Sequence, residues 1–101
     1  GAVASWAKTL SRELGGDGIT VNNVLPGYTR TRRLEQILAD RSAVSGKSQD
    51  EVAQAMLATV PAGRFADAEE PGGVIAFLCS PAAGYVSGQS IAVDGGRMQS
   101  I

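Results

Sequence analysis

The sequence predicts an α/β fold with a parallel sheet, and it predicts that residues 1–101 form the C-terminal part of one larger domain whose N-terminal part is missing. The segments follow the order helix, strand, helix pair, helix, strand, which joins parallel strands through helical crossovers. Only two strands are predicted, and a parallel pair normally lies within a larger sheet covered on both faces. The first helix also lacks a capping residue ahead of its apolar positions. The chain is therefore expected to begin inside a helix.

Composition narrows the class of protein. The 101 residues are 44% hydrophobic and 19% charged, with a formal net charge of −1, which is ordinary for a soluble globular domain. No apolar run approaches the roughly 20 residues of a membrane span, so we expect no membrane partner. Mild acidity without a basic stripe argues against nucleic acid. No charged leader precedes an apolar stretch, and a cytoplasmic protein is expected.

The chain offers few nucleophiles or soft metal ligands. It has no His and a single Cys, so neither a nitrogen–sulfur metal site nor a Cys-His or Ser-His-Asp system can be assembled. Cys79 lies in the apolar run 74–79 and is predicted to be a small buried residue. Arg30, Arg32 and Arg33 form the one basic cluster, interpreted as the solvated start of a helix.

The first helix is predicted over residues 1–14. One face carries the apolar residues Val3, Trp6, Ala7, Leu10 and Leu14. Trp6 is interpreted as a core or subunit contact. The glycine-rich segment 15–18 ends the helix.

Two helices are predicted in the middle of the chain. The first runs over residues 32–45 and ends at Gly46, with Leu34, Ile37, Leu38 and Val44 facing inward. Ser48 and Glu51 have the spacing of a capping box that opens the second helix. Pro61 is predicted to end that helix, because proline disfavours helical backbone at the preceding residue. Its apolar positions are Val52, Ala55, Met56 and Val60.

A last helix carries Val74, Phe77 and Leu78 and stops before Pro81. Pro71 cannot sit in its interior without a clash one turn back, so either a late start with Pro71 in the first turn or a bent helix is expected. The closing strand is predicted over residues 90–93.

The most informative stretch runs from Ile19 to Thr31. A buried strand over residues 19–25 ends at Pro26, which removes a ladder donor, and a polar loop follows. Gly27 has no Cβ, so a flat ligand could approach the backbone there. Ligands of α/β proteins bind just past the carboxyl ends of parallel strands, which makes this a candidate ligand loop. An ordinary strand-to-helix turn is the alternative interpretation.

Four motifs occur in a set order and spacing. They are the helix Ala7–Leu14; the segment Gly18–Gly27 with Thr31 four residues on, as P-G-x-x-x-T; Gly63–Phe65 followed by Glu69 and Glu70; and Tyr85–Gln89 followed by Val93–Gly96. Together they resemble the C-terminal portion of a short-chain dehydrogenase/reductase, with a leaning towards reductases of 3-oxoacyl thioesters. The resemblance covers essentially the whole chain.

The resemblance implies a doubly wound, Rossmann-type sheet that binds NAD or NADP. It also implies hydride transfer between the nicotinamide and a secondary alcohol or ketone. By position, Pro26 and Gly27 line the cofactor pocket and the Thr29 backbone pairs with the nicotinamide carboxamide. The Thr31 hydroxyl also reaches that amide, which needs a donor and an acceptor at fixed geometry.

The same resemblance implies that residues 30–60 form a cap over a small carbonyl or alcohol substrate. Tyr28 and Arg30 are candidate substrate contacts that face one cleft, with surface placement as the alternative. A homodimer or homotetramer is implied for the full-length protein. No metal is implied.

The family's phosphate loop and its acid/base Tyr and Lys lie upstream of this segment, so no catalytic residue is assigned within it. We expect Lys immediately before Gly1 and Tyr four residues earlier, and we expect the isolated chain to be inactive. The alternative is a non-catalytic relative that binds nucleotide or assembles with partners. The choice between NAD and NADP is set by residues upstream of this segment.

Overall fold

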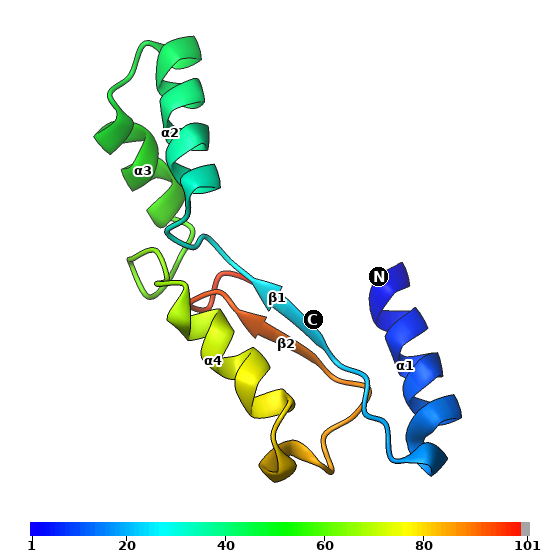
Figure 1. Ribbon diagram of the computed structural model, residues 1–101. Helices are drawn as coiled ribbons and strands as arrows, with labels where there is room; N and C mark the ends of the chain where they lie inside the picture. The colour runs from blue at the N-terminus through cyan, green and yellow to red at the C-terminus, as the bar shows by residue number, and fades with distance from the viewer. Residues whose placement is uncertain (100–101) are drawn as a thin grey trace.

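The computed structural model describes residues 1–99 and has the predicted α/β order (Figure 1). The elements are α1 (Ala2–Leu14), a 3₁₀ turn η1 (Gly15–Asp17), β1 (Asn23–Pro26), α2 (Arg32–Ser45), α3 (Gln49–Leu57), α4 (Glu69–Leu78), a 3₁₀ turn η2 (Pro81–Ala83) and β2 (Ser90–Val93). The two strands pair in parallel, as their helical connection requires.

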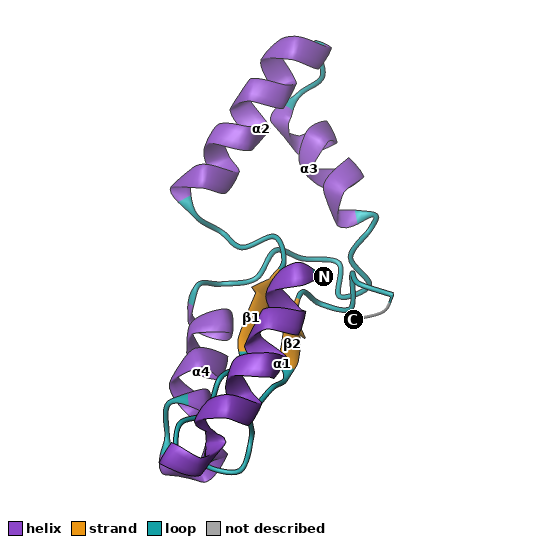
Figure 2. Cartoon of the chain, turned by 90° about the vertical axis from the view of Figure 1, so that its right-hand side faces the viewer, coloured by secondary structure: helices purple, strands orange, loops and turns teal. Residues whose placement is uncertain are grey.

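Helices lie on both sides of the strand pair. The strands pair from Asn23 opposite Ser90 to Pro26 opposite Val93. α4 lies along one side of the pair and α1 on the opposite side (Figures 1 and 2). The α2–α3 hairpin extends beyond the carboxyl ends of the strands (Figure 1). This is the layering of a doubly wound sheet.

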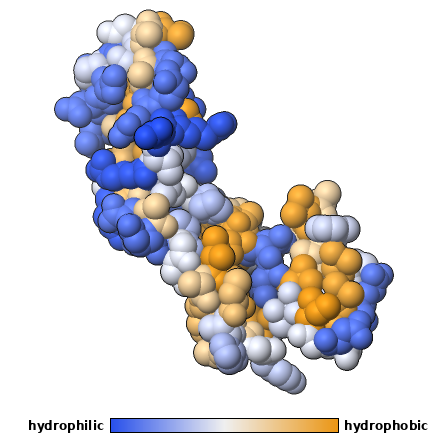
Figure 3. All heavy atoms as spheres, in the orientation of Figure 1, coloured by the Kyte–Doolittle hydropathy of each residue, from blue (hydrophilic) through white to orange (hydrophobic). Residues whose placement is uncertain are grey.

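The first helix forms as predicted but buries little. Its N-cap Gly1 makes no side-chain cap, and Ala7 is its one buried residue. Trp6 is 65% exposed, so it makes no core contact within the described residues. Figure 3 shows apolar surface on α1 and around α4, whereas the surface of the hairpin is mainly hydrophilic. A 3₁₀ turn, which the sequence pattern did not predict, continues the helix before Gly18 turns the chain at φ 74°.

The first strand is shorter than predicted. It begins at Asn23 rather than Ile19, and its residues are half-buried except for the exposed Pro26. The preceding residues bond instead to the loop before β2: Gly88 N–H donates to the Val21 carbonyl at 2.7 Å. The Asn22 side chain donates to the Val86 carbonyl at 3.1 Å. Because β2 begins only at Ser90, residues 19–22 have no partner within β2.

Helices α2 and α3 begin where the sequence predicts. Gly46 ends α2 in the left-handed region, and both halves of the Ser48–Glu51 capping box are present. However, α3 ends at Leu57, and Val60 is buried outside the helix. Val44, predicted to face inward, is 90% exposed because it lies in the last turn of α2, beyond the reach of the hairpin core.

The last helix begins late. α4 starts at Glu69, which places Pro71 in its first turn, where a missing amide proton costs nothing. Cys79 is exposed rather than buried, because it is the C-cap residue beyond the packed part of α4. The closing strand forms at the predicted residues.

A hydrophobic cluster joins the α2–α3 hairpin to the segment before α4. It consists of Leu34, Val52, Met56 and Phe65. Tyr28, just past β1, packs on this cluster. The hairpin is thereby fixed to the end of the sheet. No helix formed by residues 1–99 has both the length and the apolar character to cross a membrane.

Candidate functional site

The carboxyl ends of the two strands meet at Gly27 and Asp94. Gly27 N–H donates to the Val93 carbonyl at 2.9 Å. A Cβ placed on Gly27 would lie 2.7 Å from the Asp94 Cβ and 2.8 Å from its Cα, which no real side chain tolerates. The structure therefore gives Gly27 a packing reason, contact with the neighbouring strand end, where the sequence suggested approach of a ligand.

Asp94 organises the chain that follows β2. Its carboxylate accepts hydrogen bonds from the backbone N–H of Gly96 at 3.0 Å and of Met98 at 2.9 Å. Gly95 and Gly96 both have positive φ, and Gly95 packs against Val60. One carboxylate thus holds a tight turn against the loop after α3.

The loop after β1 is itself extended and paired. Thr29 forms a parallel bridge with Ala66. Ala66 donates its N–H to the Tyr28 carbonyl at 2.9 Å and accepts from the Arg30 N–H at 2.8 Å. In an extended chain, successive residues present their N–H and C=O groups to opposite edges. The N–H and C=O of Thr29 therefore point away from Ala66.

Both threonines of the loop are tied to the backbone. The Thr29 hydroxyl donates to the Gly27 carbonyl at 3.1 Å. Thr31 is the N-cap of α2, and its hydroxyl oxygen accepts from the Leu34 N–H at 3.2 Å. The Thr31 hydroxyl proton remains available to donate, and the side chain is exposed.

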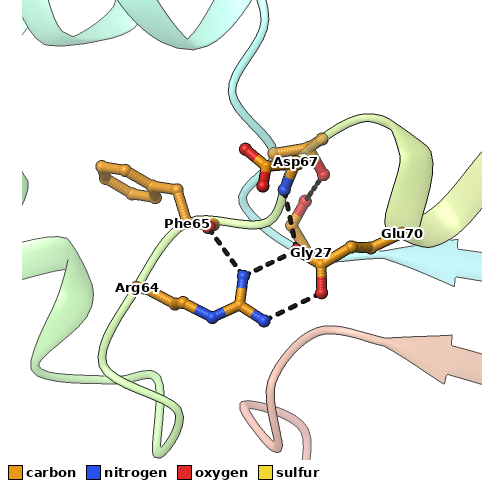
Figure 4. A network of polar contacts seen from close by, with 6 residues as sticks. Gly27, Arg64, Phe65, Asp67 and Glu70 are labelled. Carbon is orange, nitrogen blue, oxygen red and sulfur yellow. Dashed lines mark hydrogen bonds and ion pairs between the residues drawn. The ribbon is translucent and has the colours of Figure 1, made fainter.

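An ion pair holds the segment that carries Ala66 (Figure 4). Arg64 and Glu70 form two contacts, at 2.6 Å and 2.8 Å. The Glu70 carboxylate also accepts from the Asp67 N–H at 3.0 Å, at the start of α4. The Arg64 hydrogen bond, followed by that of the Asp67 amide, lowers the pKa of Glu70 to about 2.

We expect the Glu70 carboxyl to titrate near pH 2, well below the ordinary glutamate value of 4.5. Because the folded pKa lies below the unfolded one, the pair stabilises the protein fully above about pH 4.5, and this contribution is lost as the pH falls towards 2. The NMR chemical shift of the Glu70 carboxyl carbon, followed through an acid titration, measures the midpoint.

Arg64→Gln is the matched control for this titration. It removes the charge and the paired contacts but leaves the Asp67 amide bond, so the Glu70 midpoint should rise part of the way towards 4.5. A midpoint near 4.5 in the unaltered protein would show that the pair does not persist in solution.

An apolar cleft lies between α2 and α3, beside the loop. Its volume is about 630 Å³. Its apolar lining comes from Tyr28, Val44, Val52, Ala55 and Met56, with charged side chains such as Arg41 and Glu51 also contributing. Arg30 lies outside this cleft and against the Phe65 ring, at 5.7 Å, so the expectation that Tyr28 and Arg30 face one cleft is wrong. Both side chains contact the Phe65 ring, Tyr28 edge to face and Arg30 through its guanidinium, but only Tyr28 lines the cleft.

Sequence reasoning placed Arg64, Glu70 and Asp94 in motifs but assigned them no contacts, and it did not single out Ala66 or Arg97. Two local signals were available. Glu70 lies three residues after Asp67, where a carboxylate accepts from the free amides of a first helical turn, and Asp94 precedes two glycines, a pattern typical of a tight turn held by an Asp side chain. The contacts of Ala66 and Arg97 join residues far apart in the chain.

Comparisons with known proteins identify the family. The sequence matches the family described as enoyl-(acyl carrier protein) reductase over residues 1–98. It is 44% identical to a cyclohexanol dehydrogenase of a Rhodococcus strain, over 94% of this chain and 32% of that protein. It is 37% identical to a 3-oxoacyl-(acyl-carrier-protein) reductase of Vibrio cholerae, over 93% of this chain and 34% of that protein.

Solved structures of related reductases have a similar fold. The structure of an actinorhodin polyketide ketoreductase with NADPH superposes with a TM-score of 0.86 at 33% identity, covering 97% of this chain and 38% of that one. The chain belongs to the short-chain dehydrogenase/reductase family and has part of its Rossmann-type fold. It spans about a third of the length of the curated relatives it matches.

Proposed function

We propose that this chain is the C-terminal part of an NAD(P)-dependent oxidoreductase that transfers hydride between the nicotinamide and a secondary alcohol or ketone, such as a 3-oxoacyl thioester. The chain would contribute the loop on the nicotinamide side and the cap over the substrate. The observation that carries the proposal is the backbone of Thr29, whose N–H and C=O point away from its bridge to Ala66.

The loop offers the groups that a primary amide needs. A carboxamide presents a carbonyl oxygen and an NH₂ group. The Thr29 N–H donates to the first, and its C=O accepts from the second. The Thr31 hydroxyl proton supplies one more donor, because the hydroxyl acts only as an acceptor in the cap of α2. Pro26 and Gly27 form the adjoining wall of the pocket at the end of β1.

Two features support a larger parent domain. The radius of gyration is 16.8 Å, whereas about 13 Å is typical of a compact domain of this length. Large apolar side chains are also exposed on both sides of the sheet: Val3 and Trp6 on α1, Ile75 and Phe77 on α4. Additional strands and helices from the upstream part would cover such surfaces.

The cleft between α2 and α3 fits the apolar part of a ketone. Tyr28 lines it and directly precedes Thr29, so a molecule in the cleft lies beside the proposed nicotinamide position. Relatives act, by name, on cyclohexanol and on 3-oxoacyl groups. Structures with NADPH or NADP among the relatives support a nicotinamide cofactor. A cytoplasmic location and a homodimer or homotetramer stay predictions.

The full-length protein tests this function directly. Purified protein is titrated with NADH and with NADPH, and then mixed with cyclohexanone or a 3-oxo ester while the absorbance of the reduced nicotinamide is followed. Binding and ketone-dependent oxidation of one cofactor are expected. Binding without turnover would favour the alternative, a non-catalytic nucleotide-binding relative. Failure to bind either cofactor contradicts the proposal.

Thr31→Val is expected to weaken the binding of the nicotinamide cofactor by about two- to tenfold, from the loss of one hydrogen bond of about 0.5–1.5 kcal/mol. The same change removes the α2 N-cap and lowers the free energy of unfolding by about 0.5–2 kcal/mol. Fluorescence titration with the cofactor and a denaturant melt measure the two effects separately.

Two further variants separate the effect of losing the helix cap from the effect of losing the cofactor contact. Thr31→Ser keeps the hydroxyl and should restore both properties. Ser48→Ala removes the equivalent cap of α3, away from the loop, and should lower stability without changing the cofactor dissociation constant. Equal dissociation constants for Thr31→Val and Ser48→Ala would remove Thr31 from the cofactor site.

A further inference from the structure

Arg97, beyond the last strand, stacks on Tyr28. Its guanidinium carbon lies 4.7 Å from the centre of the Tyr28 ring. Its Nε donates to the Thr59 hydroxyl at 3.3 Å, and that hydroxyl donates to the Met56 carbonyl at 2.7 Å. Both Tyr28 and Thr59 line the cleft between α2 and α3. Arg97 thus joins two walls of the cleft.

The backbone of Arg97 is held by Asp94. The Asp94 carboxylate accepts from the amides of Gly96 and Met98, the residues on either side of Arg97, and the Arg97 N–H donates to the Asp94 carbonyl at 3.3 Å. Asp94 in turn contacts Gly27 at the end of β1. The side chain therefore extends from an anchored turn rather than from a free tail.

Tyr28 is held on its other sides by the hairpin core. Its ring meets the Phe65 ring edge to face, with centroids 6.2 Å apart. Its carbonyl accepts the Ala66 amide. The backbone of Tyr28 is thus secured by the bridge, and Arg97 holds the ring through a cation–π contact.

We propose that Arg97 is a positioning residue that sets the Tyr28 ring in the wall of the substrate cleft, and so controls the binding of the ketone without touching the cofactor. This inference rests on the proposed function. It follows that loss of Arg97 changes the Michaelis constant for the ketone, while binding of the nicotinamide cofactor is retained. A purely structural role would alter both constants or neither.

The test uses steady-state kinetics of the full-length protein with NADPH or NADH, whichever it accepts, and with cyclohexanone and two 3-oxo esters of different chain length. Arg97→Ala should raise the ketone KM by about two- to fivefold, the range of an exposed cation–π contact, with kcat and the cofactor dissociation constant unchanged. Arg97→Lys keeps the cation and should restore part of the affinity. Arg12→Ala, on the distant α1, is the matched control.

A double-mutant cycle with Tyr28→Leu shows whether Arg97 acts through the ring. In the Tyr28→Leu background, Arg97→Ala should have little further effect on the ketone KM. Equal effects in both backgrounds overturn the inference, as does an unchanged KM in the single variant of an active enzyme. An unaltered protein that reduces none of these ketones contradicts the proposed function and this inference together.

Discussion

Gly27→Ala is expected to have the largest effect of any single substitution on the loop. The new Cβ would lie within 2.8 Å of two atoms of Asp94, one of them backbone, so the strand ends must separate. Overpacking of this kind costs about 1–3 kcal/mol. A displacement of the loop by about 1 Å also lowers catalysis by as much as about 100-fold. Denaturant melts and kcat/KM for a ketone measure the two consequences in the full-length protein.

Gly72→Ala is the matched control. Gly72 lies in α4 with open space where a Cβ would stand, so the same substitution should raise stability by about 0.5–1 kcal/mol through helix propensity. Opposite signs at the two glycines are therefore expected. If Gly27→Ala were as stable and as active as the unaltered protein, the close approach of Gly27 to Asp94 would not exist in solution.

Asp94→Ala is expected to have the second largest effect. It removes the acceptor of two backbone amides, those of Gly96 and Met98, and releases the turn that carries Arg97. The free energy of unfolding should fall by about 1–3 kcal/mol, within the range for charge-assisted hydrogen bonds. The ketone KM should rise as it does in Arg97→Ala, because the same contact with Tyr28 is lost. Thermal melts and steady-state kinetics follow both properties.

Asp94→Asn separates the two contributions. It keeps one acceptor oxygen and the side-chain shape, but it places an NH₂ group against the second amide. An intermediate loss of stability is expected. If Asp94→Ala destabilises the protein yet leaves the ketone KM unchanged, the turn acts on the fold alone and does not position Arg97.

Local chemistry was sufficient to predict most element boundaries. Gly46 ends α2 because a left-handed residue satisfies the last carbonyls of a helix, and Ser48 begins α3 through its capping box. Pro71 could lie only in the first turn of α4 if that helix was straight. Each of these depends on residues within one helical turn, so the sequence alone was enough. The parallel pairing also followed from the order of the elements.

The beginning of β1 and the exposure of individual side chains depended on distant contacts. Residues 19–22 continue the strand pattern that the sequence predicts, yet β1 begins at Asn23 because its partner strand begins at Ser90. Val44 and Cys79 are apolar by type but stand at helix ends that nothing in the described residues covers. Pattern alone cannot show where a neighbouring element stops.

For the candidate site, the sequence by itself determined the loop: a proline and a glycine that end a strand, followed by Thr29 and Thr31. Only the tertiary structure decided which of their groups are free. Thr29 presents its backbone outward because Ala66, far along the chain, occupies its other edge. Arg97 reaches Tyr28 because the parallel strands bring their carboxyl ends together. Such pairings depend on the crossover that aligns two distant segments, and no local spacing encodes that alignment.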